Sequence, residues 1–422
     1  MKKDVEKKIY RVKVFTKEKT YNGIQLDSHD SKTILLKLDN GYNIGIKKSD
    51  VKKIENIKEI KDKKNADKIN QDKKLDGVAV IITGGTIASK VDYTTGAVKP
   101  TTKISDLIHN TPELSKIARI NSIEVPFLVQ SEDITSSHWK KLAKKTAELL
   151  NKQNNKGVII LHGTDTTHHT AAALSFMLKN LGKPVVLTYS QRSIDRGSSD
   201  AFLNLKCAFH AALSKIGEVI VVGHASTEDN YCYALRGTKV RKMHSSRRDA
   251  FKPINIDPLA RIYPDGKIEY IEEYRKRDEQ KKAKALADFE DKVALVKFSP
   301  NSSSDILYHF LKSKYKGIVI EGTGFGNISV ESKDSWTQAV KKLSEKMIVC
   351  MTTQTIFGRT NPKVYSNGRK IEKAGALFLK DMLSETAYVK LGCMLAREKS
   401  IEKVKKLMLQ DFAHEFNDRI TN

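Results

Sequence analysis

Four continuous apolar runs, each leading into a turn, restrict the middle of this chain to one kind of fold. They occupy residues 77–83, 157–161, 184–188 and 218–222. Strands that are apolar on both faces are typical of parallel sheets covered by helices on both sides. Stretches with helical character lie between the runs, at residues 138–151, 170–180 and 200–215. We therefore expect an α/β domain with a doubly wound sheet over residues 76–271.

The regions on either side of this domain have different patterns. Residues 1–75 contain short alternating segments separated by polar turns, which predicts a small N-terminal β-barrel followed by a linker. A charged connection, 272–291, has no buried-strand character. Strand–helix alternation then resumes over 292–422, in a smaller α/β domain that ends in an amphipathic helical tail over 400–420. The length of 422 residues also favours two or three domains.

Composition excludes some functions and leaves others open. The net charge of +25 suits nucleic acid or acidic partners, but the lysines are scattered, which equally suits a solvated surface. Four widely spaced cysteines indicate neither a zinc site nor a disulfide framework. No apolar run approaches the roughly 20 residues that span a bilayer, and the N-terminus lacks the apolar core of a secretion signal. We therefore expect a cytoplasmic protein with no membrane contact.

The motif Thr83-Gly-Gly-Thr-Ile-Ala-Ser89 follows the first apolar run directly. In an open α/β sheet, ligands bind beyond the carboxyl ends of the strands, so this turn lies where sites form. Paired glycines let the backbone bend sharply and bring amide N–H groups close to a bound group. The spacing matches neither a dinucleotide loop nor a phosphate loop. By itself the motif fits a structural turn nearly as well as a site.

A second motif, His162-Gly-Thr-Asp-Thr166, also follows an apolar strand. Thr164 and Asp165 could supply a hydroxyl relay and a carboxylate across a cleft from the first motif, although for this motif alone helix capping is the favoured interpretation. Lys242 lies in a basic segment, where a partly desolvated lysine could act as a base and a solvated loop is the simpler interpretation. The histidines near this motif lack a partner at ligand spacing, so we expect no metal site.

Together these motifs resemble the L-asparaginase family over nearly all of the chain from residue 77 onward. The resemblance implies that Thr86 is the nucleophile, which attacks a side-chain amide carbon and forms an acyl-enzyme. It implies that Thr164, Asp165 and Lys242 handle the proton and activate the attacking group or water. A weak alcohol nucleophile needs such a relay.

The same resemblance implies a set of substrate-binding residues. Tyr93 would close over the site on a loop, Ser131 would bind the α-carboxylate, and Asp165 would also bind the α-amino group. Glu132 follows Ser131 where simple asparaginases commonly have glutamine.

Within this family, the chain looks most like the members that form the D-type subunit of archaeal glutamyl-tRNA(Gln) amidotransferases. The N-terminal β module and the segments 191–200, 245–251 and 381–391 carry this resemblance. It implies a glutaminase that passes ammonia to a partner, the E-type subunit of the amidotransferase, which converts Glu-tRNA(Gln) to Gln-tRNA(Gln). ATP and Mg are expected on that partner, which would also hold most of the tRNA, and no cofactor is expected in this chain. A homodimer within a heterotetramer is the implied assembly.

Other functions stay open at this point. Asparagine could serve as the amide donor, since one methylene is worth only about 1–3 kcal/mol of discrimination. A stand-alone cytoplasmic L-asparaginase would use the same residues and leave the N-terminal module for dimerisation or stability. A non-enzymatic RNA-binding protein would use the basic barrel, but the complete threonine, aspartate and lysine set argues against it.

Overall fold

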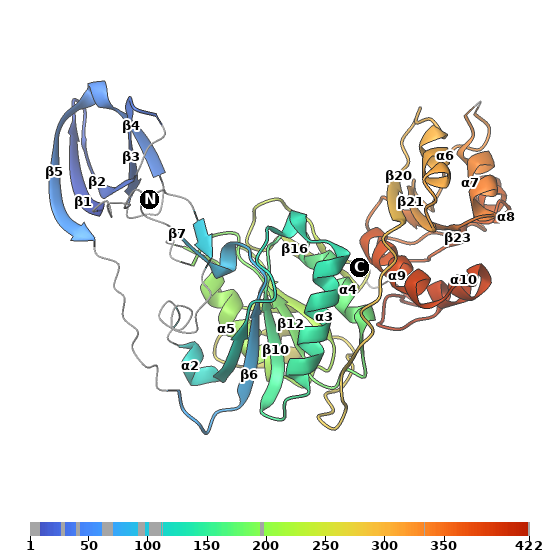
Figure 1. The fold of residues 1–422 in the computed structure, drawn as a ribbon, viewed down its shortest axis with the longest axis horizontal. Coiled ribbons are helices and arrows are strands. Elements are labelled where there is room, and N and C mark those ends of the chain that lie inside the picture. Colours follow the sequence, from blue (N-terminus) through green and yellow to red (C-terminus); the bar gives the residue numbers. More distant parts are fainter. Residues whose placement is uncertain are drawn as a thin grey trace, which may run out of the picture.

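The computed structural model contains three larger sheets, each formed by a different stretch of the chain (Figure 1). The structure describes residues 9–26, 30–38, 43–60, 71–91, 98–100, 111, 113–194, 198–332 and 334–420. Within this part of the chain, no helix is both long enough and apolar enough to cross a membrane.

The N-terminal module is a five-stranded antiparallel sheet. Its strands run in the order β4-β3-β2-β1-β5, with bounds β1 Ile9–Thr16, β2 Thr20–Leu26, β3 Thr33–Leu38, β4 Asn43–Lys47 and β5 Val51–Ile60. Alternate side chains of these strands point to one side, and there Val12, Val14, Leu36 and Ile46 form a small core. The predicted small N-terminal β domain is confirmed, and its described strands form one antiparallel sheet.

The central domain is built on an eight-stranded sheet in the order β18-β17-β14-β13-β12-β10-β6-β9. Five neighbouring strands are parallel: β9 Arg119–Glu124, β6 Gly77–Ile82, β10 Asn155–Leu161, β12 Val185–Thr188 and β13 Val219–His224. Three antiparallel strands extend one edge: β14 Cys232–Arg236, β17 Ala260–Ile262 and β18 Ile268–Tyr270. The four predicted apolar runs are the strands β6, β10, β12 and β13.

Helices cover both faces of this sheet, as predicted (Figure 1). One face packs against α3 Ser136–Leu150 and α4 Thr167–Met177, the other against α2 Leu114–Ile117 and α5 Ala201–Ala212. Strand β6 contributes Ala79 and Ile81 to the first core and Val78 and Val80 to the second. Because successive strand residues point to opposite faces, an all-apolar strand requires this double cover.

The connection between the two α/β domains packs along the central domain. Its strand β19 Lys284–Ala285 pairs with β11 Leu178–Lys179. Asn151, after α3, also accepts from the Ala283 N–H (2.8 Å) and donates to the Ala283 carbonyl (2.9 Å). The segment predicted as a charged connection is therefore held by backbone and side-chain hydrogen bonds.

The C-terminal domain is a four-stranded parallel sheet in the order β20-β21-β22-β23. Its elements are β20 Val293–Lys297, α6 Asp305–Lys312, β21 Gly317–Gly322, α7 Trp336–Ser344, β22 Ile348–Thr353, α8 Ser366–Lys373, β23 Leu377–Phe378, α9 Ser384–Arg397 and α10 Ile401–Leu409. Helix α9 packs against α4 of the central domain and against β21 of its own domain. The first of the two cores of the central domain therefore continues into the C-terminal domain.

The tail is not helical to its end, so the predicted helix over residues 400–420 is wrong beyond Leu409. The buried ammonium group of Lys390 donates to the carbonyls of Met408 (3.0 Å) and Gln410 (2.6 Å). It also pairs with the carboxylate of Glu415 at 2.6 Å. Carbonyls at a helix end need such a donor when no further turn follows. The amphipathic pattern in the sequence does not reveal this buried lysine.

Candidate active site

Three chain segments meet at the carboxyl ends of β6 and β10. The N–H of Thr83 donates to the carbonyl of Leu161 (3.1 Å), and the N–H of Val129 donates to the carbonyl of Thr83 (3.1 Å). Gly84 has a φ of +125°, and a Cβ atom there would lie 2.2 Å from the carbonyl oxygen of Val129. Only glycine fits at this position, because the backbone is both left-handed and enclosed.

The two glycine-containing motifs touch through their backbones. Gly85 has a φ of +82°, and a Cβ atom on it would lie 2.5 Å from the Cα of Gly163. A Cβ atom on Gly163 would in turn lie 2.8 Å from the Cβ of Ser131. Thr86 and Thr164 each directly follow one of the glycines in this contact. The structure therefore brings the first and second predicted motifs together.

Thr86 begins a short 3₁₀ turn, η2 Thr86–Ala88. The next residues, Ile87 and Ala88, are buried in the core on one face of the central sheet. Thr86 itself is half-buried, at the edge of this packed turn. The apolar residues anchor the turn, and the threonine stays at its accessible end.

Lys242 reaches the second motif from a distant strand. It ends β15 Val240–Lys242, which pairs with β16 Phe251–Pro253. Its ammonium group lies 2.8 Å from the hydroxyl of Thr164 and 2.8 Å from a carboxylate oxygen of Asp165. The lysine side chain is 10% exposed and the aspartate 63% exposed. The cation is thus withdrawn from water beside a hydroxyl, while the carboxylate faces solvent and is accessible to a ligand.

This contact also decides between the two interpretations of the second motif. The residue at the N-cap of α4 is Thr166, so neither Thr164 nor Asp165 caps the helix. Their side chains contact Lys242 instead. The capping interpretation is wrong, whereas the catalytic roles of these residues stay predictions.

Ser131 joins the same site through the turn η3 Ser131–Asp133. Its buried hydroxyl accepts from the N–H of Asp165 (3.2 Å), and its carbonyl accepts from the hydroxyl of Thr166 (2.6 Å). Glu132 is exposed on the same turn. Ser131 therefore lies against the second motif, and its role in binding a carboxylate stays a prediction.

Tyr93, the predicted loop tyrosine, falls within residues 92–97, outside the described residues. Short strands flank that segment, β7 Ser89–Val91 and β8 Val98–Pro100, and they pair with each other.

Histidines line the buried side of the second motif. His162 is completely buried, which lowers its pKa to about 4, so its imidazole is neutral at neutral pH. Burial likewise holds the pKa of His168 well below its ordinary value, and the positive charges of Arg241 and Lys242 add to the effect. Within the described residues, no three histidine, cysteine or acidic side chains are grouped as metal ligands.

Four charged residues around β15 were not predicted as part of the site. Lys239 pairs with Asp381 at 2.6 Å, and Arg241 pairs with Glu385 at 2.8 Å. Both acidic residues belong to the segment 381–391, which the sequence marked only as a family signature. A charge pattern along one chain does not reveal a partner 142 residues away.

Three known families each match one of the stretches of the chain that form the three larger sheets. Residues 77–276 match the family "Asparaginase, N-terminal", and residues 292–408 match the "Glutaminase/Asparaginase C-terminal domain". Residues 7–57 match the "GatD N-terminal domain".

Individual proteins match nearly the whole chain. The D-type subunit of glutamyl-tRNA(Gln) amidotransferase from Pyrococcus abyssi is 47% identical over 405 residues, covering 94% of this chain and 91% of that protein. The same protein from Methanococcus maripaludis strain C7 is 42% identical, covering 97% of this chain and 98% of that protein. Among solved structures, the thermostable L-asparaginase from Thermococcus kodakarensis superimposes with a TM-score of 0.71 at 28% identity, covering 81% of this chain and 99% of the asparaginase.

Proposed function

Because the chain belongs to the family of D-type subunits of glutamyl-tRNA(Gln) amidotransferases, we propose that its asparaginase-like domains hydrolyse glutamine through Thr86. The chain is the glutaminase component of a tRNA-dependent amidotransferase. One observation supports the proposed site most strongly. Lys242 contacts both Thr164 and Asp165, in the turn whose backbone touches that of Gly85, the residue before Thr86.

In the proposed reaction, the Thr86 oxygen forms a bond to the side-chain amide carbon of glutamine. The hydroxyl proton leaves through Thr164 to the amine of Lys242, whose nitrogen lies 2.8 Å from the Thr164 oxygen. When the tetrahedral intermediate collapses, the C–N bond breaks and the nitrogen takes a proton and leaves as ammonia. Water, activated by the same relay, then hydrolyses the ester on Thr86 and releases glutamate.

The substrate's other groups would be held by residues around the relay. The Asp165 carboxylate is exposed enough to bind the α-ammonium group. Ser131 is placed beside it by the Asp165 N–H, and we propose that it binds the α-carboxylate together with Glu132. Tyr93 is proposed to close over the bound amide.

The released ammonia requires an acceptor. Forming an amide from a carboxylate is unfavourable in water unless the carboxylate is first activated. We therefore propose that a partner, the E-type subunit of the amidotransferase, uses ATP and Mg to activate the glutamate on tRNA(Gln) and binds most of the tRNA. The proposed assembly is a homodimer within a heterotetramer. Because an aminoacyl-tRNA is consumed in translation, the proposed location is the cytoplasm.

A nucleophile test uses Thr86→Ala, which removes the attacking oxygen. We expect glutamine hydrolysis to fall to background while the melting temperature stays within a few degrees, because the residue is only half-buried. Thr86→Ser should retain part of the activity, since it keeps a hydroxyl. Thr227→Ala, at an exposed threonine, is the matched control and should behave like the wild type. Undiminished activity in Thr86→Ala would refute the mechanism.

A second test separates this function from that of a stand-alone L-asparaginase. The test is needed because the fold also matches that of such an enzyme. We expect slow glutamine hydrolysis by the chain alone and a marked increase when the E-type partner and Glu-tRNA(Gln) are added. Asparagine should be assayed in parallel. Full turnover of asparagine by the chain alone, unaffected by tRNA and partner, would favour the asparaginase.

A further inference from the structure

The strand that carries Lys242 is not part of the eight-stranded sheet. Among the described residues, β15 pairs with β16 in a separate two-stranded sheet. It has three residues, and Lys242 is the last of them. The pairing with β16 continues by one residue at each end, where the N–H of Met243 donates to the carbonyl of Ala250 (2.6 Å) and the N–H of Ile254 donates to the carbonyl of Lys239 (2.8 Å). Further contacts, from outside this hairpin, also hold the lysine in position.

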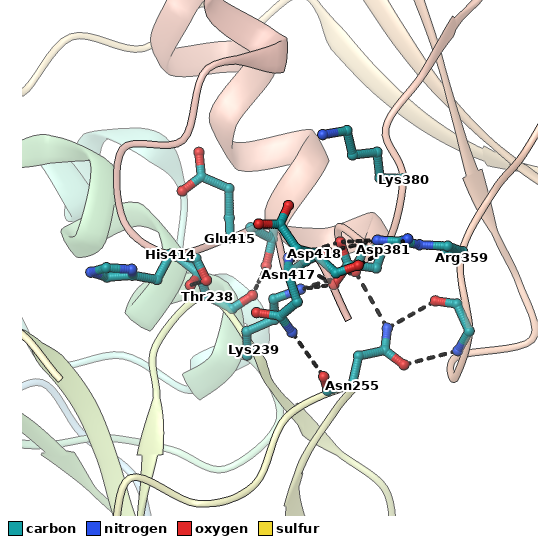
Figure 2. A network of polar contacts seen from close by, with 12 residues as sticks. Thr238, Lys239, Asn255, Arg359, Lys380, Asp381, His414, Glu415, Asn417 and Asp418 are labelled. Atoms are coloured by element: carbon teal, nitrogen blue, oxygen red, sulfur yellow. Dashed lines mark hydrogen bonds and ion pairs between the residues drawn. The ribbon is translucent and has the colours of Figure 1, made fainter. Parts of the chain in front are cut away.

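Those contacts come from the C-terminal domain, at the corner that precedes and begins α9. Lys239 donates to a carboxylate oxygen of Asp381 at 2.6 Å, and both side chains are fully buried (Figure 2). Arg241 pairs with Glu385 at 2.8 Å, where the side chains are 28% and 10% exposed. Two of the three residues before Lys242 are thus bound to the same corner.

Residues further along the chain fix this corner in turn. The N–H of Asn417, in the tail, donates to both carboxylate oxygens of Asp381 (3.1 and 3.2 Å). The side chain of Asn417 also donates to the carbonyl of Asn255, two residues beyond β16 (2.8 Å; Figure 2). The hydroxyl of Thr386 donates to the carbonyl of Thr238, two residues before β15 (2.9 Å). The tail therefore links the corner before α9 to the segment that follows β16.

The alternation of a strand explains what these ion pairs accomplish. Within β15, the side chains of Val240 and Lys242 point to one side and that of Arg241 to the other. Lys239 lies in the bend just before the strand. A shift of one residue would exchange the two sides and present Arg241, in place of Lys242, to Thr164. Buried ion pairs contribute little net stability compared with apolar contacts, but they can specify register. Here one pair holds Arg241, on the side of the strand opposite Lys242, and the other holds the bend that leads into the strand.

We propose that Asp381 and Glu385 are positioning residues, through which the C-terminal domain holds β15 in the register that brings Lys242 to Thr164 and Asp165. Neither acidic residue contacts these three groups directly through any contact that the structure describes. The inference rests on the role of Lys242 in the proposed function.

Glu385→Gln is the sharper variant, because its partly exposed ion pair can be removed without leaving a fully buried charge. Glutamine hydrolysis is measured on the full chain with its E-type partner and Glu-tRNA(Gln). We expect kcat to fall about tenfold with KM changed less than twofold, since a misplaced catalytic group affects the transition state more than binding. Glu279→Gln removes a carboxylate that pairs with Lys156 at 2.7 Å, away from β15, and should leave kcat unchanged.

The decisive measurement repeats Glu385→Gln in a Lys242→Met background, with residual turnover followed at high enzyme concentration. If Glu385 acts through Lys242, the substitution should lower kcat less than twofold there, because the group it positions is already absent. An equal, tenfold loss in both backgrounds would overturn the inference, as would an unchanged kcat in the single variant. Full activity in Lys242→Met alone would instead refute the proposed mechanism.

Discussion

The two halves of the candidate site are held in place by different forces. The threonine half, residues 83–86 and 162–165, is fixed by backbone hydrogen bonds and glycine contacts within the central domain. The lysine half, β15, is fixed by ion pairs to the C-terminal domain. The first arrangement depends on shape and the second on charge. The site is therefore complete only when both domains are packed together.

This difference predicts which substitutions each half tolerates. In the threonine half a Cβ atom added to Gly84 or Gly85 would collide with backbone, which cannot move aside. In the lysine half the contacts are between charged side chains, and an unpaired charge in a buried position is costly. The predictions below test this contrast.

The largest effect is expected for Gly85→Ala in the threonine half. The new Cβ would lie 2.5 Å from the Cα and N of Gly163, at a φ of +82°. We expect kcat/KM to fall at least about a hundredfold, because the turn that carries Thr86 must shift. Activity and thermal unfolding are measured together.

Gly324→Ala is the matched control for this prediction. Gly324 also has a positive φ (+50°), but a Cβ atom there would meet no atom within 4 Å. It should cost about 1 kcal/mol of backbone strain and leave activity unchanged. Equal behaviour of the two variants would show that contact with Gly163 does not position the nucleophile.

A smaller loss of activity is expected in the lysine half, from Asp381→Asn. The carboxylate that neutralises the buried ammonium of Lys239 is removed, so the free energy of unfolding should fall by about 3–5 kcal/mol. Measured by denaturant unfolding, the double variant Lys239→Met/Asp381→Asn should recover most of that loss, because no buried charge remains. The asparagine keeps an oxygen for the N–H of Asn417.

The double variant also tests the contrast itself. If the pair positions β15, kcat should stay about tenfold low although stability has returned. Recovery of both quantities would mean that the ion pair contributes to stability alone. In the threonine half we expect activity and stability to be lost together, because the same contacts provide both shape and stability.

The sequence predicted the threonine half better than the lysine half, for a physical reason. Apolar strands and the turns that follow them are local features, so both the α/β fold and the proximity of Thr86 and Thr164 follow from strand order. The contact between Gly85 and Gly163 could not be read from the sequence, since it depends on how closely two turns approach. Lys239 and Arg241 looked like a solvated basic loop, because their partners lie in another domain.

The last prediction concerns stability and pH rather than activity, and arises in the threonine half. His162 is fully buried next to Gly163, and its pKa is lowered from 6.5 to about 4. The unfolded chain therefore binds a proton between these values that the folded chain does not. The stability associated with neutral His162 is complete above pH 6.5 and is lost as the pH falls to about 4, a change of about 3 kcal/mol.

His162→Asn should reduce this acid destabilisation while keeping a donor near the carbonyl of Gly163, which lies 2.7 Å from Nδ1 of the histidine. The variant will be less stable at every pH because of the smaller side chain, so the slope of unfolding free energy against pH is the quantity to compare. Between pH 6.5 and 4 the slope should be shallower than in the wild type. His309→Gln, at an exposed histidine on α6, should leave the slope unchanged. An unchanged slope in His162→Asn would place the acid sensitivity elsewhere, with the ion pairs of the lysine half as the first groups to examine.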